Sequence, residues 1–203
     1  MTVVQLPSLR VSFLPYADAE TAKYKKNKMF QLNNPQINKK IQFTNLIELK
    51  EELVDTFLNE IEDPYLELYS VAHGWVLFER LVYKNVVKSH NRSQYLAACV
   101  KISVKLYECF GDLENYTEKL QSLNNDLLKF IDKMNDKSDF EIKELSSYEQ
   151  RVMFALHFQP RVPPMLVQPH LDSIQVMCDK TLEDFLGCED YKNYSERIKA
   201  KMK

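Results

Sequence analysis

Residues 65–87 are apolar on nearly every face of a helix, and this limits the possible folds more than any other feature of the chain. The apolar side chains of this stretch are Leu66, Leu68, Tyr69, Val71, Ala72, Trp75, Val76, Leu77, Phe78, Leu81 and Val82. A helix without a polar face has to be enclosed by other elements. Residues 92–107 behave likewise, and Ala97, Ala98 and Cys99 are small enough to let neighbouring helices approach closely. The sequence therefore predicts two central buried helices inside a ring of amphipathic ones.

Glycine is scarce, since the 203 residues contain only three. Tight turns between strands and phosphate-binding loops both need residues that tolerate positive φ, so the shortage disfavours sheets and nucleotide loops. A chain of this length is expected to form one domain with extensions. We therefore predict an all-α protein with its main domain at residues 41–177, preceded by an arm at residues 1–40 and followed by a helical tail at residues 178–203.

Amphipathic patterns predict the helices around the central pair. One helix is expected from Thr44, as its N-cap, to residue 61. Residues 111–136 predict a surface helix or two short ones, residues 140–156 predict another helix, and Pro169 is expected to be the first residue of a further one. Residues 1–40 mix prolines, asparagines and lysines with scattered apolar residues, which indicates an extended arm that adds little to stability.

Charge and cysteine usage exclude several classes of protein. A net charge of −2 and a pI near 6.1 give no overall field that would attract nucleic acid. The local basic cluster Lys23, Lys25, Lys26 and Lys28 is interpreted as a solvated surface, with contact to an acidic partner or a filament as the alternative. No stretch is apolar enough to cross a bilayer, and the four cysteines lack a Cys-x-x-Cys pair. We expect a cytoplasmic or nuclear protein that binds neither membranes nor metals.

Catalytic motifs are also missing. The histidines His73, His90, His157 and His170 show no nucleophile and base pattern, and paired acids are interpreted as solvated helix faces. The single tryptophan, Trp75, is expected in the core. We therefore expect a protein that is not an enzyme and has no catalytic residue and no cofactor.

Three segments carry a resemblance to a known family. Residues 71–81 read V-A-H-G-W-V-L-F-E-R-L, residues 91–108 read N-R-S-Q-Y-L-A-A-C-V-K-I-S-V-K-L-Y-E, and residues 144–158 read E-L-S-S-Y-E-Q-R-V-M-F-A-L-H-F. Their order and spacing resemble helices two, three and five of the cyclin box. Together with V-Q-P-H at residues 167–170, they are similar to the Cables family of cyclin-like proteins. The resemblance covers residues 41–174 and implies a single cyclin box, a five-helix bundle with two central buried helices.

The resemblance also implies a binding site. In cyclins, a lysine and a glutamate at the positions of Lys105 and Glu149 lie close together and receive the regulatory helix of a cyclin-dependent kinase. The other residues that it assigns to partner binding are Glu108, Leu156 and Phe158, and those that it assigns to support of the box are Glu79 and Arg80. Lys101 departs from the family because cyclins usually have an apolar residue there, so it is expected to shift the local packing or to reach solvent.

Two functions follow from the resemblance. The first is a non-catalytic regulatory subunit that binds a cyclin-dependent-kinase-type partner through helices three and five of the box. The second is a scaffolding protein that docks to a cytoskeletal or other assembly without activating a kinase. For Lys105 and Glu149 themselves, an ordinary intramolecular ion pair is the alternative to a partner-binding role.

Overall fold

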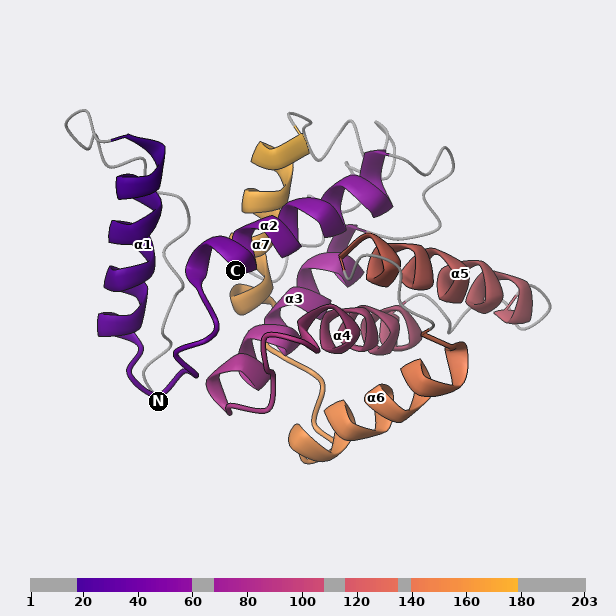
Figure 1. The fold of residues 1–203 in the computed structure, drawn as a ribbon. Coiled ribbons are helices and arrows are strands. Elements are labelled where there is room, and N and C mark those ends of the chain that lie inside the picture. Colours follow the sequence, from indigo (N-terminus) through magenta and orange to yellow (C-terminus); the bar gives the residue numbers. More distant parts are fainter. Residues whose placement is uncertain (1–17, 60–67, 108–115, 135–139, 179–203) are drawn as a thin grey trace, which may run out of the picture.

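The structure is a computed structural model of the chain, and it describes residues 18–59, 68–107, 116–134 and 140–178 (Figure 1). These residues form seven α-helices and a π-helical turn, and no strand occurs among them, which confirms the predicted all-α class. In chain order the elements are α1 (Ala19–Asn33), α2 (Phe43–Val54), the π-helical turn η1 (Asp55–Asn59), α3 (Leu68–Tyr83), α4 (Arg92–Tyr107), α5 (Tyr116–Met134), α6 (Ile142–Ala155) and α7 (Pro164–Cys178).

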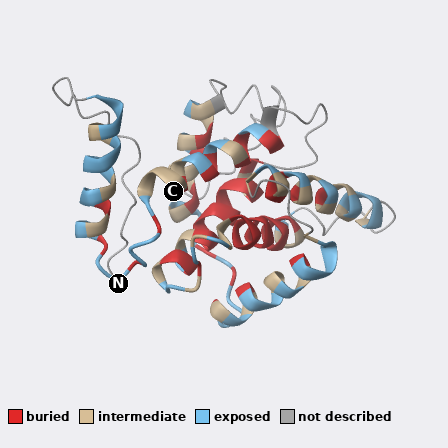
Figure 2. Ribbon diagram, in the orientation of Figure 1, coloured by how far each residue is buried: buried red, intermediate tan, exposed pale blue. Residues whose placement is uncertain are grey.

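Helices α3 and α4 form the centre of the molecule, as their apolar sequences predict. Almost every described position of both helices is buried, including Leu77, Phe78, Leu81, Leu96 and Val100 (Figure 2). The two helices contact each other more extensively than any other pair, while α7 packs on α3 and both α5 and α6 pack on α4. Most of the described surface is therefore supplied by α1, α2, α5, α6 and α7 (Figure 2).

Gly74 sets the distance between the two central helices. A Cβ atom added at this position would lie 2.9 Å from Cα of Val100 and 3.1 Å from its backbone nitrogen. Backbone atoms cannot swing aside as a side chain does, so only glycine fits at this crossing. The sequence analysis attributes the close approach to Ala97, Ala98 and Cys99, which are all fully buried in α4, and it misses the glycine opposite them in α3.

The outer helices bury one face each. Helix α5 turns Leu127, Phe130 and Ile131 inward, and the Phe130 ring lies 6.4 Å, between centroids, from the ring of Phe57 in η1. Helix α2 begins two residues earlier than predicted, with Gln42 instead of Thr44 at its N-cap. Its regular α-helical hydrogen bonding ends at Val54 and continues as the π-helical turn. These stripes close the ring around α3 and α4.

The prediction of an extended arm is wrong for residues 19–33, which form helix α1. Asp18 caps the helix, because its carboxylate accepts a hydrogen bond of 2.7 Å from the backbone N–H of Thr21. Phe30 is buried, and its ring lies 5.6 Å, between centroids, from that of Phe43 in α2. One anchoring aromatic and a good cap stabilise a helix that no core-facing stripe predicts. Residues 1–17 of the predicted arm lie outside the described residues.

The predicted start of the last helix is also wrong, because α7 begins at Pro164 and contains Pro169. At the first position of a helix the missing N–H of proline has no intrahelical partner to lose. The inner face of α7 carries Val167, Leu171 and Ile174, all buried, and burial of the first of these requires the helix to begin before Pro169. Tertiary packing therefore outweighs the local cost of an internal proline. The predicted tail beyond Cys178 lies outside the described residues.

None of the helices in the described ranges is both long enough and apolar enough to cross a membrane.

His73 links the two central helices through a polar contact inside the core. It is fully buried in α3, and its Nδ1 atom lies 2.8 Å from Oγ of Ser103 in α4. Ser103 in turn donates a hydrogen bond to the carbonyl of Cys99. Burial lowers the pKa of His73 to about 4, because the charged imidazolium would lose its hydration. The folded protein therefore holds this side chain neutral at pH 7.

Replacing Gly74 with alanine should destabilise the protein. In an unhindered helix the change would stabilise it by about 0.5–1 kcal/mol, whereas the clash with the Val100 backbone should cost roughly 1–3 kcal/mol. Urea unfolding of the full chain measures the difference. The double variant Gly74→Ala, Val100→Ala should be less stable than Val100→Ala alone, because the backbone clash remains. Equal stability of those two variants would show that only the valine methyl groups limit the approach.

The protein should lose stability as the pH falls from about 6.5 to 4. The folded-state pKa of His73 is lowered to about 4 from an ordinary value of 6.5, so the unfolded chain binds more protons in this window. Through this group the free energy of unfolding should fall by about 3 kcal/mol in total once the pH is below both pKa values. His73→Gln, which cannot titrate, should reduce the pH dependence of urea unfolding, and the exposed His90→Gln is the control. If the free energy of unfolding of the natural chain and of His73→Gln depends on pH in the same way, His73 is not the group responsible for the loss of stability.

Candidate functional site

Lys105 and Glu149 lie together, on helices that are far apart in the sequence. Lys105 is in the last turn of α4, Glu149 is in the middle of α6, and Nζ of Lys105 is in direct contact with Oε1 of Glu149. The lysine side chain is 33% exposed and the glutamate side chain 15%. The pair is therefore at the edge of the α4–α6 contact, where the lysine still reaches solvent.

Lys101 is a third member of this group, one turn before Lys105 on α4. Its side chain is only 4% exposed, and its Nζ lies 3.3 Å from Oε2 of Glu149. Burial lowers the pKa of the Lys101 ammonium, and the Glu149 carboxylate acts in the opposite direction. The expectation that Lys101 reaches solvent is wrong, because the carboxylate of α6 holds it inside. The spacing of Lys101 and Lys105, four residues on one helix, is the sequence signal that could have indicated a shared partner.

Lys101, Lys105 and Glu149 differ in how many of their donors or acceptors are used within the group. Both carboxylate oxygens of Glu149 are occupied, one by each lysine. An ammonium has three donors, and Lys105 uses one of them on Glu149, so its exposed side remains able to donate to carbonyl groups of a docked segment. Lys101 neutralises Glu149 from below and leaves the group with one net positive charge. We call Lys101, Lys105 and Glu149 the lysine–glutamate cluster.

The two apolar residues predicted beside this cluster have different surroundings. Leu156 is buried, so it belongs to the core and offers no surface to a partner. Phe158 is 62% exposed, and its ring packs edge-on against Phe154, which is 67% exposed, at 5.1 Å between centroids. Phe154 is a residue that the sequence analysis missed. It follows Glu149 on α6 by five residues, so its side chain leaves the helix about 140° around the axis from that of Glu149.

The backbone that presents Phe158 is strained. Both His157 and Phe158 have φ values in the left-handed region, at 53° and 56°, which bulky side chains rarely adopt. The turn is held by a 2.8 Å hydrogen bond from the Phe158 N–H to the Met153 carbonyl. Nζ of Lys84 also donates to the Ala155 carbonyl at 2.6 Å and ties the end of α6 to the residue that follows α3. The exposed aromatic pair is thus fixed in place from two sides.

Glu79 and Arg80 lie apart from the lysine–glutamate cluster, on α3. Glu79 accepts a 2.8 Å hydrogen bond from Nε1 of Trp75 and lies 3.3 Å from Nε2 of His170 in α7. Beside them, Nζ of Lys50 lies 5.4 Å from the centre of the Trp75 ring. Burial lowers the pKa of Lys50 to about 8, and the Glu79 carboxylate opposes this shift. Glu79 therefore joins α2, α3 and α7, whereas Arg80 is exposed.

Glu108, which the resemblance assigns to partner binding, lies outside the described residues. Within the ranges that the structure describes, no group of three or more histidine, cysteine, aspartate or glutamate side chains is placed to hold a metal ion. The candidate functional site consists of the lysine–glutamate cluster and of the exposed aromatic pair Phe154 and Phe158 at the C-terminal end of α6. We call this region the α4–α6 shoulder.

Removing the charge of Glu149 should destabilise the fold because Lys101 would be left buried without a partner. We expect Glu149→Gln to cost roughly 3 kcal/mol in urea unfolding. Lys105→Met should cost less than about 1 kcal/mol, since the Lys105 side chain is partly solvated. The double variant Lys101→Met, Glu149→Gln should regain most of the stability, because an apolar side chain suits the site of Lys101. A double variant as unstable as Glu149→Gln would show that Lys101 is not the residue that depends on Glu149.

Comparison with known proteins agrees with the resemblance in the sequence. A human protein named CDK5 and ABL1 enzyme substrate 1 is 29% identical over 168 residues, which are 83% of this chain and 24% of the human protein. A mouse protein named CDK5 and ABL1 enzyme substrate 2 is 26% identical over 168 residues, which are 83% of this chain and 32% of the mouse protein. No protein-family model matches the chain, and no solved structure matches it.

The chain spans about a quarter to a third of the length of the curated relatives that it matches. Each of four relatives from human and mouse is similar to this chain over 168 residues, which are 83% of its length. These relatives are the Cables proteins, and the predicted resemblance of this chain to the Cables family is thereby confirmed.

Proposed function

We propose that this chain is a non-catalytic, cyclin-like subunit that binds a cyclin-dependent-kinase-type protein kinase through the α4–α6 shoulder. The observation that supports this most is the form of the shoulder itself. Lys105 on α4 is one third exposed and is held by Glu149 of α6, and the turn that follows α6 carries the exposed and conformationally strained Phe158. Neither an exposed aromatic pair nor a strained turn stabilises the free protein, so their presence favours a role in contacting a partner.

The chemistry of the shoulder suits a helix as its ligand. The free donors of Lys105 are able to bind the unpaired carbonyl groups at the C-terminal end of a docked helix, where the helix dipole also favours a positive charge. Phe154 and Phe158 would cover apolar side chains of the same helix. Because Glu149, itself paired with Lys101, holds Lys105 in position before binding, little side-chain entropy would be lost on docking.

The relatives support a kinase as the partner. Their names state that they are substrates of the kinases CDK5 and ABL1, which connects proteins of similar sequence with kinases. In this proposal the chain has no active site and acts by favouring one conformation of the kinase through differential binding. It would work where such kinases are found, in the cytoplasm or the nucleus. Docking to a cytoskeletal assembly without kinase activation is the alternative outcome of the test below.

Lys105→Glu should weaken binding to the kinase and leave the fold intact. Two acids would then face each other at the shoulder, and binding should weaken by roughly 2–5 kcal/mol if the charge is desolvated in the complex. Lys129→Glu is the matched control, because Lys129 is also paired with an acid, Asp126, but lies on α5. Purification of each tagged chain from native extract, with mass spectrometry and a melting curve, measures both properties. Changes at Glu149 are unsuitable here because they also affect the buried Lys101.

Phe158→Asn tests the aromatic part of the shoulder. Asparagine adopts left-handed φ values more readily than phenylalanine does, so the turn should persist while the exposed ring is lost. We expect weaker kinase binding without a lower melting temperature. If Lys105→Glu and Phe158→Asn both stay folded and retain every kinase, the α4–α6 shoulder is not the binding surface. Recovery of filament proteins instead of kinases would favour the scaffolding function.

A further inference from the structure

Helix α1 differs from an ordinary surface helix in where its apolar side chains lie. Such a helix usually buries its apolar stripe and turns polar side chains to water. In α1, Tyr24, Met29 and Leu32 are 65%, 62% and 70% exposed, and only Phe30 among its large apolar side chains is buried. The apolar residues of this helix therefore mostly face solvent.

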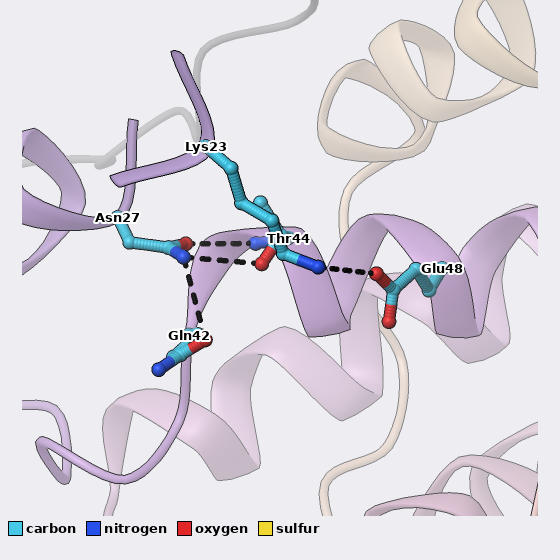
Figure 3. A network of polar contacts seen from close by, with 5 residues as sticks. All are labelled: Lys23, Asn27, Gln42, Thr44 and Glu48. Carbon is cyan, nitrogen blue, oxygen red and sulfur yellow. Dashed lines mark hydrogen bonds and ion pairs between the residues drawn. The ribbon is translucent and has the colours of Figure 1, made fainter. Parts of the chain in front are cut away.

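Polar contacts hold the inner side of α1 against α2 (Figure 3). Asn27 accepts a hydrogen bond of 3.0 Å from the backbone N–H of Thr44 and donates from its amide to the side chains of Thr44, at 3.1 Å, and Gln42, at 3.3 Å. Nζ of Lys23 lies 3.2 Å from the carboxylate of Glu48. These bonds fix which face of α1 points outward. Asn27 also satisfies one of the first N–H groups of α2, that of Thr44, from outside that helix.

The outward face carries positive charge between its apolar residues. Tyr24, Lys28 and Leu32 follow one another at intervals of four and form one ridge, while Lys25 and Met29 form the ridge beside it. Nζ of Lys28 lies 5.9 Å from the centre of the Tyr24 ring. Helix α1 contains four lysines and one glutamate, and of the lysines only Lys23 is turned toward α2. We call Tyr24, Lys25, Lys28, Met29 and Leu32 the outer face of α1.

We propose that the outer face of α1 is a docking surface for an acidic, amphipathic segment of a partner protein. Carboxylates of such a segment would pair with Lys25 and Lys28, and its apolar side chains would cover Met29 and Leu32. This inference does not depend on the proposed kinase binding, because α1 contacts α2 and lies on another side of the molecule from α6 (Figure 1).

Two other occupants of the outer face of α1, a second copy of the chain and a membrane surface, fit it less well. A second copy that docked through the same face would place the lysines of the two helices opposite each other, and like charges at a contact repel. A membrane surface would take up only three apolar side chains from a 15-residue helix, and these are separated by polar positions. An acidic, amphipathic segment offers both carboxylates that pair with the lysines of this face and apolar side chains that cover its exposed apolar residues.

The test uses the folded full chain and a displayed library of random 16-residue peptides. Peptides selected on the natural chain should be enriched in Asp and Glu together with Leu, Ile, Phe or Met. In fluorescence anisotropy, Lys25→Glu, Lys28→Glu should weaken binding of a selected peptide at least about tenfold. The matched control Lys39→Glu, Lys40→Glu has the same change in net charge at exposed lysines of the α1–α2 loop, and it should change the affinity less than about twofold.

A second variant separates the apolar part from the charge. Met29→Ser, Leu32→Ser should weaken binding of the same peptide to a similar extent at high and low salt. The loss of affinity caused by Lys25→Glu, Lys28→Glu should be smaller at high salt. The proposal is overturned if no peptide is enriched, if the selected peptides lack acidic residues, or if the two lysine variants bind equally. It is also overturned if the outer-face variants instead abolish self-association in light scattering or binding to phosphatidylserine vesicles.

Discussion

The close approach of α3 and α4 at Gly74 and Val100 is the constraint on which the rest of the structure depends. Because a Cβ atom at position 74 would lie 2.9 Å from Cα of Val100, the two helices pack more closely than a residue with a side chain at this position would allow. Both then lose nearly all contact with water, so each needs other helices to cover its remaining faces. Helices α5 and α6 cover α4, and α7 covers α3. The position of α6 beside α4, and hence of the α4–α6 shoulder, follows from this central crossing.

At the shoulder, one carboxylate serves both the fold and the surface. Glu149 neutralises the buried Lys101 with one oxygen and holds Lys105 at the rim with the other. The interpretation of Lys105 and Glu149 as an ordinary ion pair is therefore compatible with the proposed binding site, because the structural contact involves Lys101 and the proposed partner contact involves Lys105. Buried ion pairs contribute little net stability compared with apolar side chains, so the proposed contact of Lys105 with a partner would give the cluster a role that stability alone does not.

The two proposed binding surfaces differ in how they are supported. The shoulder is part of the central packing, and a buried lysine and a strained turn fix its residues. The outer face of α1 belongs to a peripheral helix that α2 holds through Asn27, Lys23 and the buried ring of Phe30. Fewer apolar contacts hold α1, so this helix is expected to open locally at a lower cost than α3 or α4. If both proposals hold, the protein would contact two partners at once.

The sequence by itself determined the all-α class and the two central helices, because an apolar surface on every face of a segment has only one stable placement. It also determined α4 at residues 92–107 and the resemblance that singles out Lys105 and Glu149. Other features of the fold were decided only by tertiary structure, because no local sequence pattern specifies them. The start of α7 before Pro169, the burial of Leu156 and Lys101, and the helical form of residues 19–33 all depend on contacts with residues distant in the sequence. Packing energy in these places outweighs local propensity, which is worth about 1 kcal/mol or less per ordinary residue.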